Sequence, residues 1–283
     1  MTLAYLALTA RILLLGVERI VVKKMGSGSD CMSAAFLFFF IGGLFLLPFT
    51  LLENAAWTDM IPRTMSSGIF YSLAFILYVR SLSIGEASLV SPLYNFNIFF
   101  LALLAAFFLG EGLGIKKILS LILLVYGASF LQRGKNVWES LRFLWKDKAC
   151  VYMMTASMLI AAGRVIDKSG MISFKPVTYC CVLYFCISLY IFIYILARKK
   201  SGEISLLLRR KPAVTITSGA INGFSYLFLL YAMTGIEVSV AEPLSMLGIL
   251  VTLVLSAVVF REKIGYRLIG AGIMIIGAWM LVV

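Results

Sequence analysis

The sequence predicts an all-α integral membrane protein of ten transmembrane helices, arranged as two inverted five-helix repeats around a central cavity. Two observations predict this fold: the composition and an internal repeat. The 283 residues are 62% hydrophobic and only 13% charged, whereas an ordinary soluble domain is about 25% charged. Apolar runs of about 18 residues, enough to cross the ~30 Å hydrocarbon core of a bilayer, recur from end to end. We therefore expect the bilayer to be the solvent of this chain.

Charged residues and Pro/Gly punctuation divide the apolar sequence into ten candidate spans. The first span is long enough to cross a membrane and carries internal charges, so we expect it to stay in the mature protein and not to be a cleaved leader. The spans cover residues 2–23, 33–52, 64–83, 91–109, 116–132, 150–168, 176–197, 213–234, 244–260 and 267–283.

The longest linkers are 133–149 and 198–212, both too short for a soluble domain. The first is basic and carries apolar residues at helical spacing, which predicts a short amphipathic helix at the level of the lipid headgroups. Those residues are Trp138, Leu141, Leu144 and Trp145.

The two halves of the chain carry the same motifs in the same order. An R-[IV]-[IV]-x-K string occupies 19–23 in the first span and 164–168 in the sixth. The motif E-x-S-x-x-x-P-L follows at 86–93 and again at 237–244. In both halves an acid stands 19 residues after the proline of that motif, as Glu111 and Glu262. The chain thus divides into a first repeat at 1–132, the basic linker at 133–149 and a second repeat at 150–283.

The number of spans in each repeat determines how the repeats are related. A unit of five spans begins and ends on opposite sides of the membrane, so the second copy must be inserted upside down. Inverted repeats are typical of secondary transporters, in which two equivalent packings of the halves open a central site to either side in turn.

These motifs resemble the drug/metabolite transporter superfamily, in its ten-helix EamA-like branch. The resemblance rests on the five-plus-five repeat, the fourth span that starts at a proline, and the acid that closes it in LGEGLG at 109–114 and FREKIG at 260–265. It covers nearly the whole chain. It implies a basket of ten helices whose cavity is lined by the first, third and fourth spans of each half. It also implies transport of a metabolite or drug, without fixing the substrate.

Arg11 is the first candidate site residue, because it falls near the middle of the first span. An unpaired charge there costs at least about 2.5 to 3.5 kcal/mol, so it needs a partner. Glu18 lies two turns further along the same helix face and can point with it toward the interior. The equivalent of Arg11 in the second half is Ala156, which favours substrate or ion chemistry. A purely structural ion pair is the alternative.

Other charged residues within the predicted spans are also candidates for the site. Arg164 and Asp167 lie three residues apart on one helix face, so they either contact the solute or pair locally. Arg19 and Lys23 lie toward the end of their helix, where basic side chains are expected to reach the interface. Glu242 stands immediately before a proline and is matched by a serine in the first half. The candidates for proton coupling are Glu18, Asp167 and Glu242.

Uncharged candidates complete the predicted substrate-binding set, with helix–helix hydrogen bonding as their alternative role. In contrast, the paired acids of the two repeats are expected to cap helix N-termini, and the Gly248, Thr252, Ser256 stripe is expected to allow close helix packing. The uncharged candidates are Tyr71, Tyr78, Asn95, Asn222 and Tyr226; the paired acids are Glu86, Glu111, Glu237 and Glu262.

The predicted function is secondary transport, by alternating access, of a small polar organic solute such as an amino acid or related metabolite. If Arg11 binds the solute, an anionic or zwitterionic compound is favoured, because a buried guanidinium needs a carboxylate or phosphate partner. The alternatives are a flippase for a lipid-linked sugar and a proton-coupled multidrug exporter. A receptor or assembly scaffold is a further alternative, but it does not explain an inverted repeat with unmatched buried charges.

Enzyme chemistry is not expected. The chain has no His, no metal-ligand spacing and no nucleophile motif, so we expect no metal and no cofactor. Its five cysteines are expected to serve packing and not disulfides. The net charge of +12 lies in short segments between apolar runs, which indicates lipid headgroups as the partner and excludes nucleic acid. The solute and membrane lipids are the expected partners, and a monomer is sufficient.

We expect a multi-pass protein of the cell (inner) membrane. Most Lys and Arg residues fall on one side, including the linker at 133–148 and the run at 198–211. The positive-inside rule places that side in the cytoplasm and both termini outside. The family resemblance implies the opposite orientation, with both termini inside.

Overall fold

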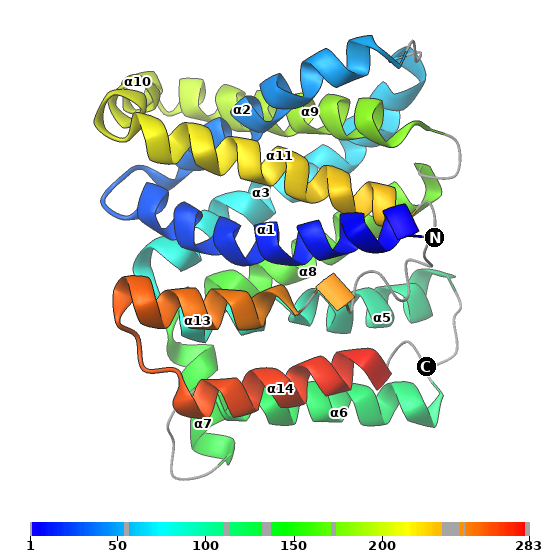
Figure 1. Cartoon of the computed structure of the whole chain (residues 1–283), viewed down its shortest axis with the longest axis vertical. Helices are drawn as coiled ribbons and strands as arrows, with labels where there is room; N and C mark the ends of the chain where they lie inside the picture. Colours follow the sequence, from blue (N-terminus) through cyan, green and yellow to red (C-terminus); the bar gives the residue numbers. More distant parts are fainter. Residues whose placement is uncertain are drawn as a thin grey trace.

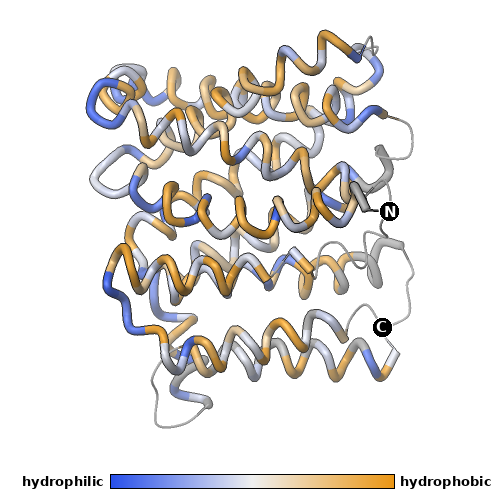
Figure 2. Tube along the Cα trace, viewed as in Figure 1, coloured by the Kyte–Doolittle hydropathy of each residue, from blue (hydrophilic) through white to orange (hydrophobic). Residues whose placement is uncertain are grey.

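The described part of the chain is a bundle of helices packed side by side, with no strand among the described residues (Figure 1). The computed structural model describes residues 2–53, 57–109, 114–131, 137–170, 174–233, 244–245 and 247–280. Hydrophobic residues run along the helices, and hydrophilic ones gather mainly at their ends (Figure 2). Among the described residues, five helical stretches are long and apolar enough to cross a membrane: Cys31–Leu51, Thr58–Ile84, Lys148–Asp167, Pro176–Ala197 and Pro212–Ala232.

The helices of the first half fall where the spans were predicted, except that the fourth is broken in two. They are α1 (Thr2–Gly26), α2 (Cys31–Leu51), the 3₁₀ turn η1 (Thr58–Met60) leading into α3 (Ile61–Ile84), α4 (Ala87–Leu93), α5 (Phe96–Leu109) and α6 (Ile115–Ser129).

The second half repeats this order of elements. Its helices are α8 (Lys148–Gly170), α9 (Pro176–Ala197), α11 (Pro212–Met233), α13 (Gly248–Phe260) and α14 (Gly265–Met280). The two linkers contain α7 (Val137–Lys146), as predicted, and α10 (Ser201–Arg210), which the sequence analysis left as a connection. Ten membrane crossings and the inverted relation of the halves stay predictions.

The core lies between the two halves of the chain. The strongest contacts join α3 to α8, α1 to α11, α6 to α14 and α2 to α9. Exchanging first-half helices for their second-half equivalents turns the α1–α11 contact into the α8–α3 contact, and it leaves the other two pairs unchanged. The halves therefore pack against each other through equivalent elements, and any space at this interface is shared by both.

The α1–α13 crossing is close because glycines face each other there. A Cβ placed on Gly248 would lie 2.8 Å from the carbonyl oxygen of Ile12, and one on Gly16 would lie 2.4 Å from Cβ of Val251. Thr252 donates from Oγ1 to the carbonyl oxygen of Gly16 at 3.3 Å. The predicted close packing along the Gly248 stripe is thus confirmed.

The fourth helix of the first half is interrupted just after its proline. Pro92 has no N–H to bond to the carbonyl of Ser88, so it weakens the ladder of this short helix. The next residues use tighter bonds to the third preceding residue: Tyr94 N–H to Ser91 and Asn95 N–H to Pro92, at 3.2 and 3.0 Å. In the described part of the second half, one bond of this type lies near the corresponding place, from Leu247 N–H to the carbonyl of Leu244 at 3.1 Å. The first fourth helix thus contains a stretch of 3₁₀-type turns, which often marks a functional position.

Both ends of the chain lie on one side of the bundle, opposite α7, α10 and the α13–α14 connection (Figure 1). The predicted basic segments therefore share one end of the molecule, which we call the basic end.

Gly248→Ile is expected to destabilise the protein, because its side chain would overlap the backbone of α1. Overpacking of this kind costs about 1 to 3 kcal/mol. Thermal unfolding in detergent should show a lower Tm for this variant. Gly272→Ala is the control, since no atom lies within 4 Å of a Cβ there. The control should leave the Tm unchanged or raise it, because alanine favours a helix over glycine. Equal effects of both variants would contradict the close crossing.

Candidate functional site

Several ionisable side chains are enclosed in the apolar bundle. The exposed fractions of Arg11, Glu18, Arg19 and Asp167 are 5%, 4%, 0% and 5%. Each such charge at membrane depth costs at least about 2.5 to 3.5 kcal/mol unless it is paired or hydrated. Arg19 does not reach the interface as expected from its place in the sequence, because neighbouring helices cover it completely. The partners of these groups therefore decide what the bundle centre can do.

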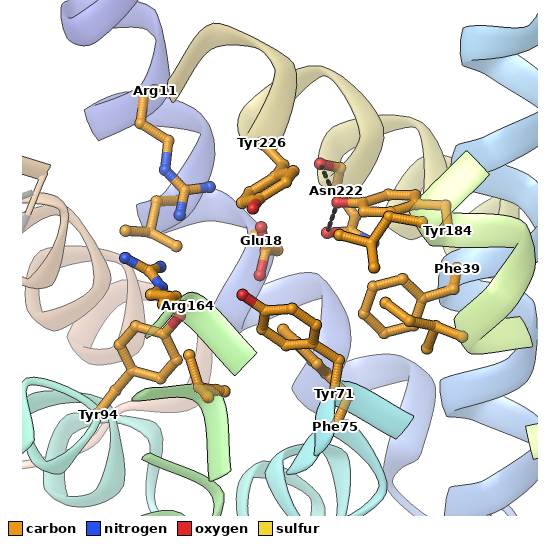
Figure 3. Close-up of a pocket in the computed structure, with 14 residues that line it drawn as sticks. Arg11, Glu18, Phe39, Tyr71, Phe75, Tyr94, Arg164, Tyr184, Asn222 and Tyr226 are labelled. Atoms are coloured by element: carbon orange, nitrogen blue, oxygen red, sulfur yellow. Dashed lines mark hydrogen bonds between the residues drawn. The ribbon is translucent and has the colours of Figure 1, made fainter. Parts of the chain in front are cut away.

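A cavity lies between the two halves, at the level of Arg11 and Glu18. Figure 3 shows Arg11 and Arg164 on one side of it, Phe39, Tyr184 and Asn222 on the other, and Glu18 between them. The cavity is lined by Arg11, Leu15, Glu18, Phe39, Tyr71, Phe75, Tyr94, Ile160, Arg164, Leu183, Tyr184, Ile187, Asn222 and Tyr226.

Arg11 and Glu18 share this cavity, as their spacing of two helical turns predicts. Nη1 of Arg11 donates a short hydrogen bond to the hydroxyl of Ser225 on α11. Nε of Arg11 has no hydrogen-bond partner among the described residues. Glu18 accepts a long hydrogen bond of 3.4 Å from the hydroxyl of Tyr78, which approaches from outside the cavity. The guanidinium and the carboxylate thus keep hydrogen-bonding capacity for a bound molecule.

Asp167 has a different environment, although it was also a candidate for proton coupling. The Tyr71 hydroxyl donates to its Oδ2 at 2.8 Å, and the Tyr179 hydroxyl donates a shorter bond to Oδ1. Both carboxylate oxygens are therefore occupied, and Asp167 does not line the cavity. The carboxylate positions Tyr71, which does line it.

Asn222 lines the cavity but is also engaged in helix packing. Its Oδ1 accepts from the hydroxyl of Tyr184 at 2.8 Å, and its Nδ2 donates to the carbonyl of Phe38 at 3.3 Å. Asn222 thereby joins α11 to α9 and α2. The rings of Tyr184 and Tyr226 stack beside it, with centroids 6.0 Å apart.

The structure brings most of the predicted site residues together. Arg11, Glu18, Tyr71, Arg164, Asn222 and Tyr226 line the central cavity. Asn95 lines a smaller cavity that adjoins it. Tyr78 touches Glu18 without lining either cavity. Glu242 lies outside the described residues, as do Glu111 and Glu237.

Sequence reasoning missed two tyrosines of the cavity. Tyr94 lies at the break between α4 and α5, and the preceding Pro92 is the signal that marks this position. Tyr184 comes from the middle of a uniformly apolar run in α9, where no pattern distinguishes it. Its position depends on how α9 packs against α2 and α11.

Glu86 of the first half and Glu262 of the second each bind residues of the other half. Glu262 does not cap its own α14 as expected, but the N-terminus of α4: it accepts from the N–H groups of Ala87 and Ser88 at 3.0 and 2.8 Å. Lys23 on α1 donates to Glu262 at 2.7 Å and to the carbonyl of Gly85 at 2.8 Å. Glu86, expected to be a cap, makes no capping bond with its side chain.

Glu86 pairs instead with Arg267 of α14. Arg267 also binds the hydroxyl of Ser88, and its Nε donates to the carbonyl of Leu131 at 3.2 Å. We call Lys23, Glu86, Glu262 and Arg267 the basic-end network. It joins the two halves at the basic end of the bundle.

The protonation of Glu262 is biased by this network. Burial opposes its ionisation, but hydrogen bonds from Lys23 and Ser88 outweigh that effect and hold the pKa of Glu262 below its ordinary value. Glu262 lies in the connection between α13 and α14, outside the helices themselves.

Comparison with known proteins gives a family and a fold. The profile of the EamA-like transporter family matches residues 2–132 and 147–283. A search of the curated proteins found no match. A solved structure titled "Crystal structure of protein" superposes with a TM-score of 0.62 at 14% identity, over 98% of this chain and 95% of that chain. At that identity the likeness shows the fold alone.

Tyr71→Phe and Tyr179→Phe are each expected to destabilise the protein, because each leaves an oxygen of Asp167 without a donor. An unsatisfied buried group costs about 1 to 3 kcal/mol. The Tm of the purified protein should fall for both variants but not for Tyr5→Phe, whose side chain is exposed. In an Asp167→Asn background the same substitutions should cost less. Equal losses in both backgrounds would show that the hydroxyls act elsewhere.

Proposed function

Because the chain belongs to the EamA-like transporter family, we propose that it is a secondary transporter that moves a small polar organic solute by alternating access. One observation carries the proposal: the charged cavity lies between the two halves of the chain. Arg11 and Glu18 come from the first helix of one half and Arg164 from the first helix of the other. A relative movement of the halves would change the access to all three groups.

The chemistry of the cavity favours an anionic or zwitterionic solute, such as an amino acid or related metabolite. The guanidiniums of Arg11 and Arg164 suit a carboxylate or phosphate. Glu18, between them and the opposite wall, suits an ammonium group. The aromatic wall formed by Phe39, Phe75 and Tyr184 suits an apolar part of the solute.

The contacts between the halves support ten helices in two inverted repeats. The dominant contacts are unchanged when equivalent helices are exchanged. The first fourth helix is interrupted by 3₁₀-type turns after its proline. Discontinuous helices at a repeat interface are typical of transporter binding sites.

The basic-end network suits the role of a closing contact at one end of the cavity. It joins α1 and α4 of the first half to the α13–α14 connection of the second. In an alternating-access cycle these bonds would form when the basic end is closed and break when it opens. The contact between Lys23 and Glu262 is a non-covalent ion pair, so it can form and break, and it requires an ionised Glu262.

Glu18 is the acid that we assign to proton coupling, if the transport is proton-driven. It is buried, lines the cavity and lies near the site of the proposed solute. Asp167 is already engaged by two tyrosine hydroxyls. Glu242, which lies outside the described residues, stays the second candidate of the sequence analysis.

A thermal-shift screen of the purified protein tests the function. Saturation at 100 times Kd stabilises a protein by about 2.7 kcal/mol. A soluble amino acid, nucleotide or sugar phosphate should raise the Tm of the wild type, and the same compound should accumulate in proteoliposomes. Both effects should be lost in Arg11→Ala and kept in Arg209→Ala, which removes an exposed arginine of α10.

The other outcomes separate the alternatives. Stabilisation by lipid-linked sugars alone would favour the flippase, and stabilisation by diverse drugs with proton-dependent export would favour the multidrug exporter. A transported compound whose binding ignores Arg11 would overturn the assignment of this residue but not transport.

Glu262→Gln is expected to weaken the basic-end network by about 1 to 3 kcal/mol, because it removes a charged acceptor. The pKa of Glu262 is lowered in the folded protein, so its stabilising contribution is present above its unfolded pKa of about 4.5 and is lost as the pH falls through the folded pKa. The Tm difference between wild type and variant should therefore be largest near neutral pH and shrink in acid. Glu203→Gln on α10 is the control. A difference independent of pH would contradict this role.

A further inference from the structure

A second, smaller cavity adjoins the central one on the side of α5. It is narrow and shares Arg11, Leu15, Tyr94 and Arg164 with the central cavity. Its own lining comes from Arg19, Asn95, Asn97 and Ser245. The two cavities are therefore neighbouring parts of one space, divided by the side chains that they share.

Arg19 is the dominant group of the smaller cavity. Its side chain is completely buried, and Nε, Nη1 and Nη2 have no hydrogen-bond partner among the described residues. The guanidinium lies over the ring of Tyr94, with Cζ 5.1 Å from the centroid. A ring face offers some electrostatic stabilisation but no acceptor for five N–H donors. Such a group is expected to bind an acceptor that the protein does not supply.

Two asparagines beside Arg19 are also unsatisfied. Both amide atoms of Asn95 and Oδ1 of Asn97 are buried without a partner in the part of the chain that the structure describes. Asn95 is 1% exposed and Asn97 is 3% exposed. Asn95 lies at the break between α4 and α5, and Asn97 lies in the first turn of α5; their backbone N–H groups bond to the carbonyls of Pro92 and Tyr94. Their side chains are thus available to a molecule in the cavity.

The nearby acids do not satisfy Arg19 by a direct bond. Glu18 precedes it in sequence but lines the central cavity, where it accepts from Tyr78. Asp167 is held by Tyr71 and Tyr179. Buried polar groups in native proteins are almost always paired, so a cluster of unpaired ones points to an absent ligand.

We propose that the smaller cavity binds the oxyanion group, a carboxylate or a phosphate, of the transported solute. Arg19 binds the oxyanion through its planar N–H donors, and Nδ2 of Asn95 donates to it. The body of the solute then lies in the central cavity, against the aromatic wall. The inference rests on the proposed function, since it states which part of the solute each cavity holds.

Arg11 and Arg164 border both cavities and would flank the oxyanion on the side of the solute body. The site therefore favours an organic anion whose charge lies at one end and whose other end is apolar. A zwitterion fits as well, with its ammonium group near Glu18 in the central cavity.

Simple aromatic anions test the site. Benzoate and phenyl phosphate are added to the detergent-purified protein at constant ionic strength, with benzamide as the uncharged analogue of benzoate. At least one anion should raise the Tm of the wild type by about 2 °C or more, while benzamide should not. Benzoate and phenyl phosphate also distinguish a carboxylate site from a phosphate site.

Three variants locate the effect. Arg19→Leu should abolish the anion response while keeping the Tm of the unliganded protein, because the lost guanidinium makes no hydrogen bond among the described residues. Asn95→Asp should raise the unliganded Tm and also abolish the response, since its carboxylate takes the place of the ligand beside Arg19. Arg209→Leu, which removes an exposed arginine, should behave as the wild type.

The contrary results are distinct from a failure of transport. Equal anion responses in wild type and Arg19→Leu would place the anion elsewhere and overturn the proposal. So would a large loss of Tm in unliganded Arg19→Leu together with an unchanged Asn95→Asp, which would mean a structural role for the arginine. If neither anion stabilises the wild type but a neutral or cationic compound accumulates in proteoliposomes, the oxyanion site is wrong and the transporter assignment stands.

Discussion

The cost of a buried charge is the constraint on which the rest of this structure depends. A guanidinium or carboxylate in a bilayer must be paired, hydrated or bound to a ligand, because hydrocarbon has no hydrogen-bonding groups or counter-charges. This chain places Arg11, Glu18, Arg19, Arg164 and Asp167 in the bundle centre. Asp167 is satisfied by two tyrosines, whereas Arg11 and Arg19 keep donors without acceptors. The unsatisfied groups line two adjoining cavities, which is why we propose that they bind the solute.

The charged side chains lie at the interface between the two halves. The first helix of each half packs against the third helix of the other, and the charged side chains come from these helices. The basic-end network joins the same interface near one end of the bundle. Glu262 accepts from the N-terminus of α4, and Arg267 pairs with Glu86. The proposed binding site and the proposed closing contact therefore lie at one interface, so a movement of the halves would change both. Alternating access requires this kind of coupling.

The broken fourth helix connects the local sequence to the site. Pro92 ends the α-helical ladder, and the tighter turn that follows presents Tyr94, Asn95 and Asn97 to the cavities. Discontinuous helices at membrane depth are tolerated where the freed backbone is bonded again or lines a cavity. Both conditions hold here: the N–H groups of Tyr94 and Asn95 bond to carbonyls of α4, the carbonyls of Leu93 and Tyr94 accept from the hydroxyl of Ser157, and the side chains line the smaller cavity.

The sequence by itself determined the helical membrane class, the helix positions, the family and the central place of Arg11 and Glu18. Hydropathy, helical period and motif order are local properties, so they can be read without contacts between distant residues. Only the tertiary structure decided what each side chain meets. It gave Tyr184 a place in the cavity, turned Glu262 toward α4 instead of α14, and enclosed Arg19, which was expected at the interface. Those outcomes depend on which helices become neighbours, and the residues of one helix face do not identify the helix that packs against it.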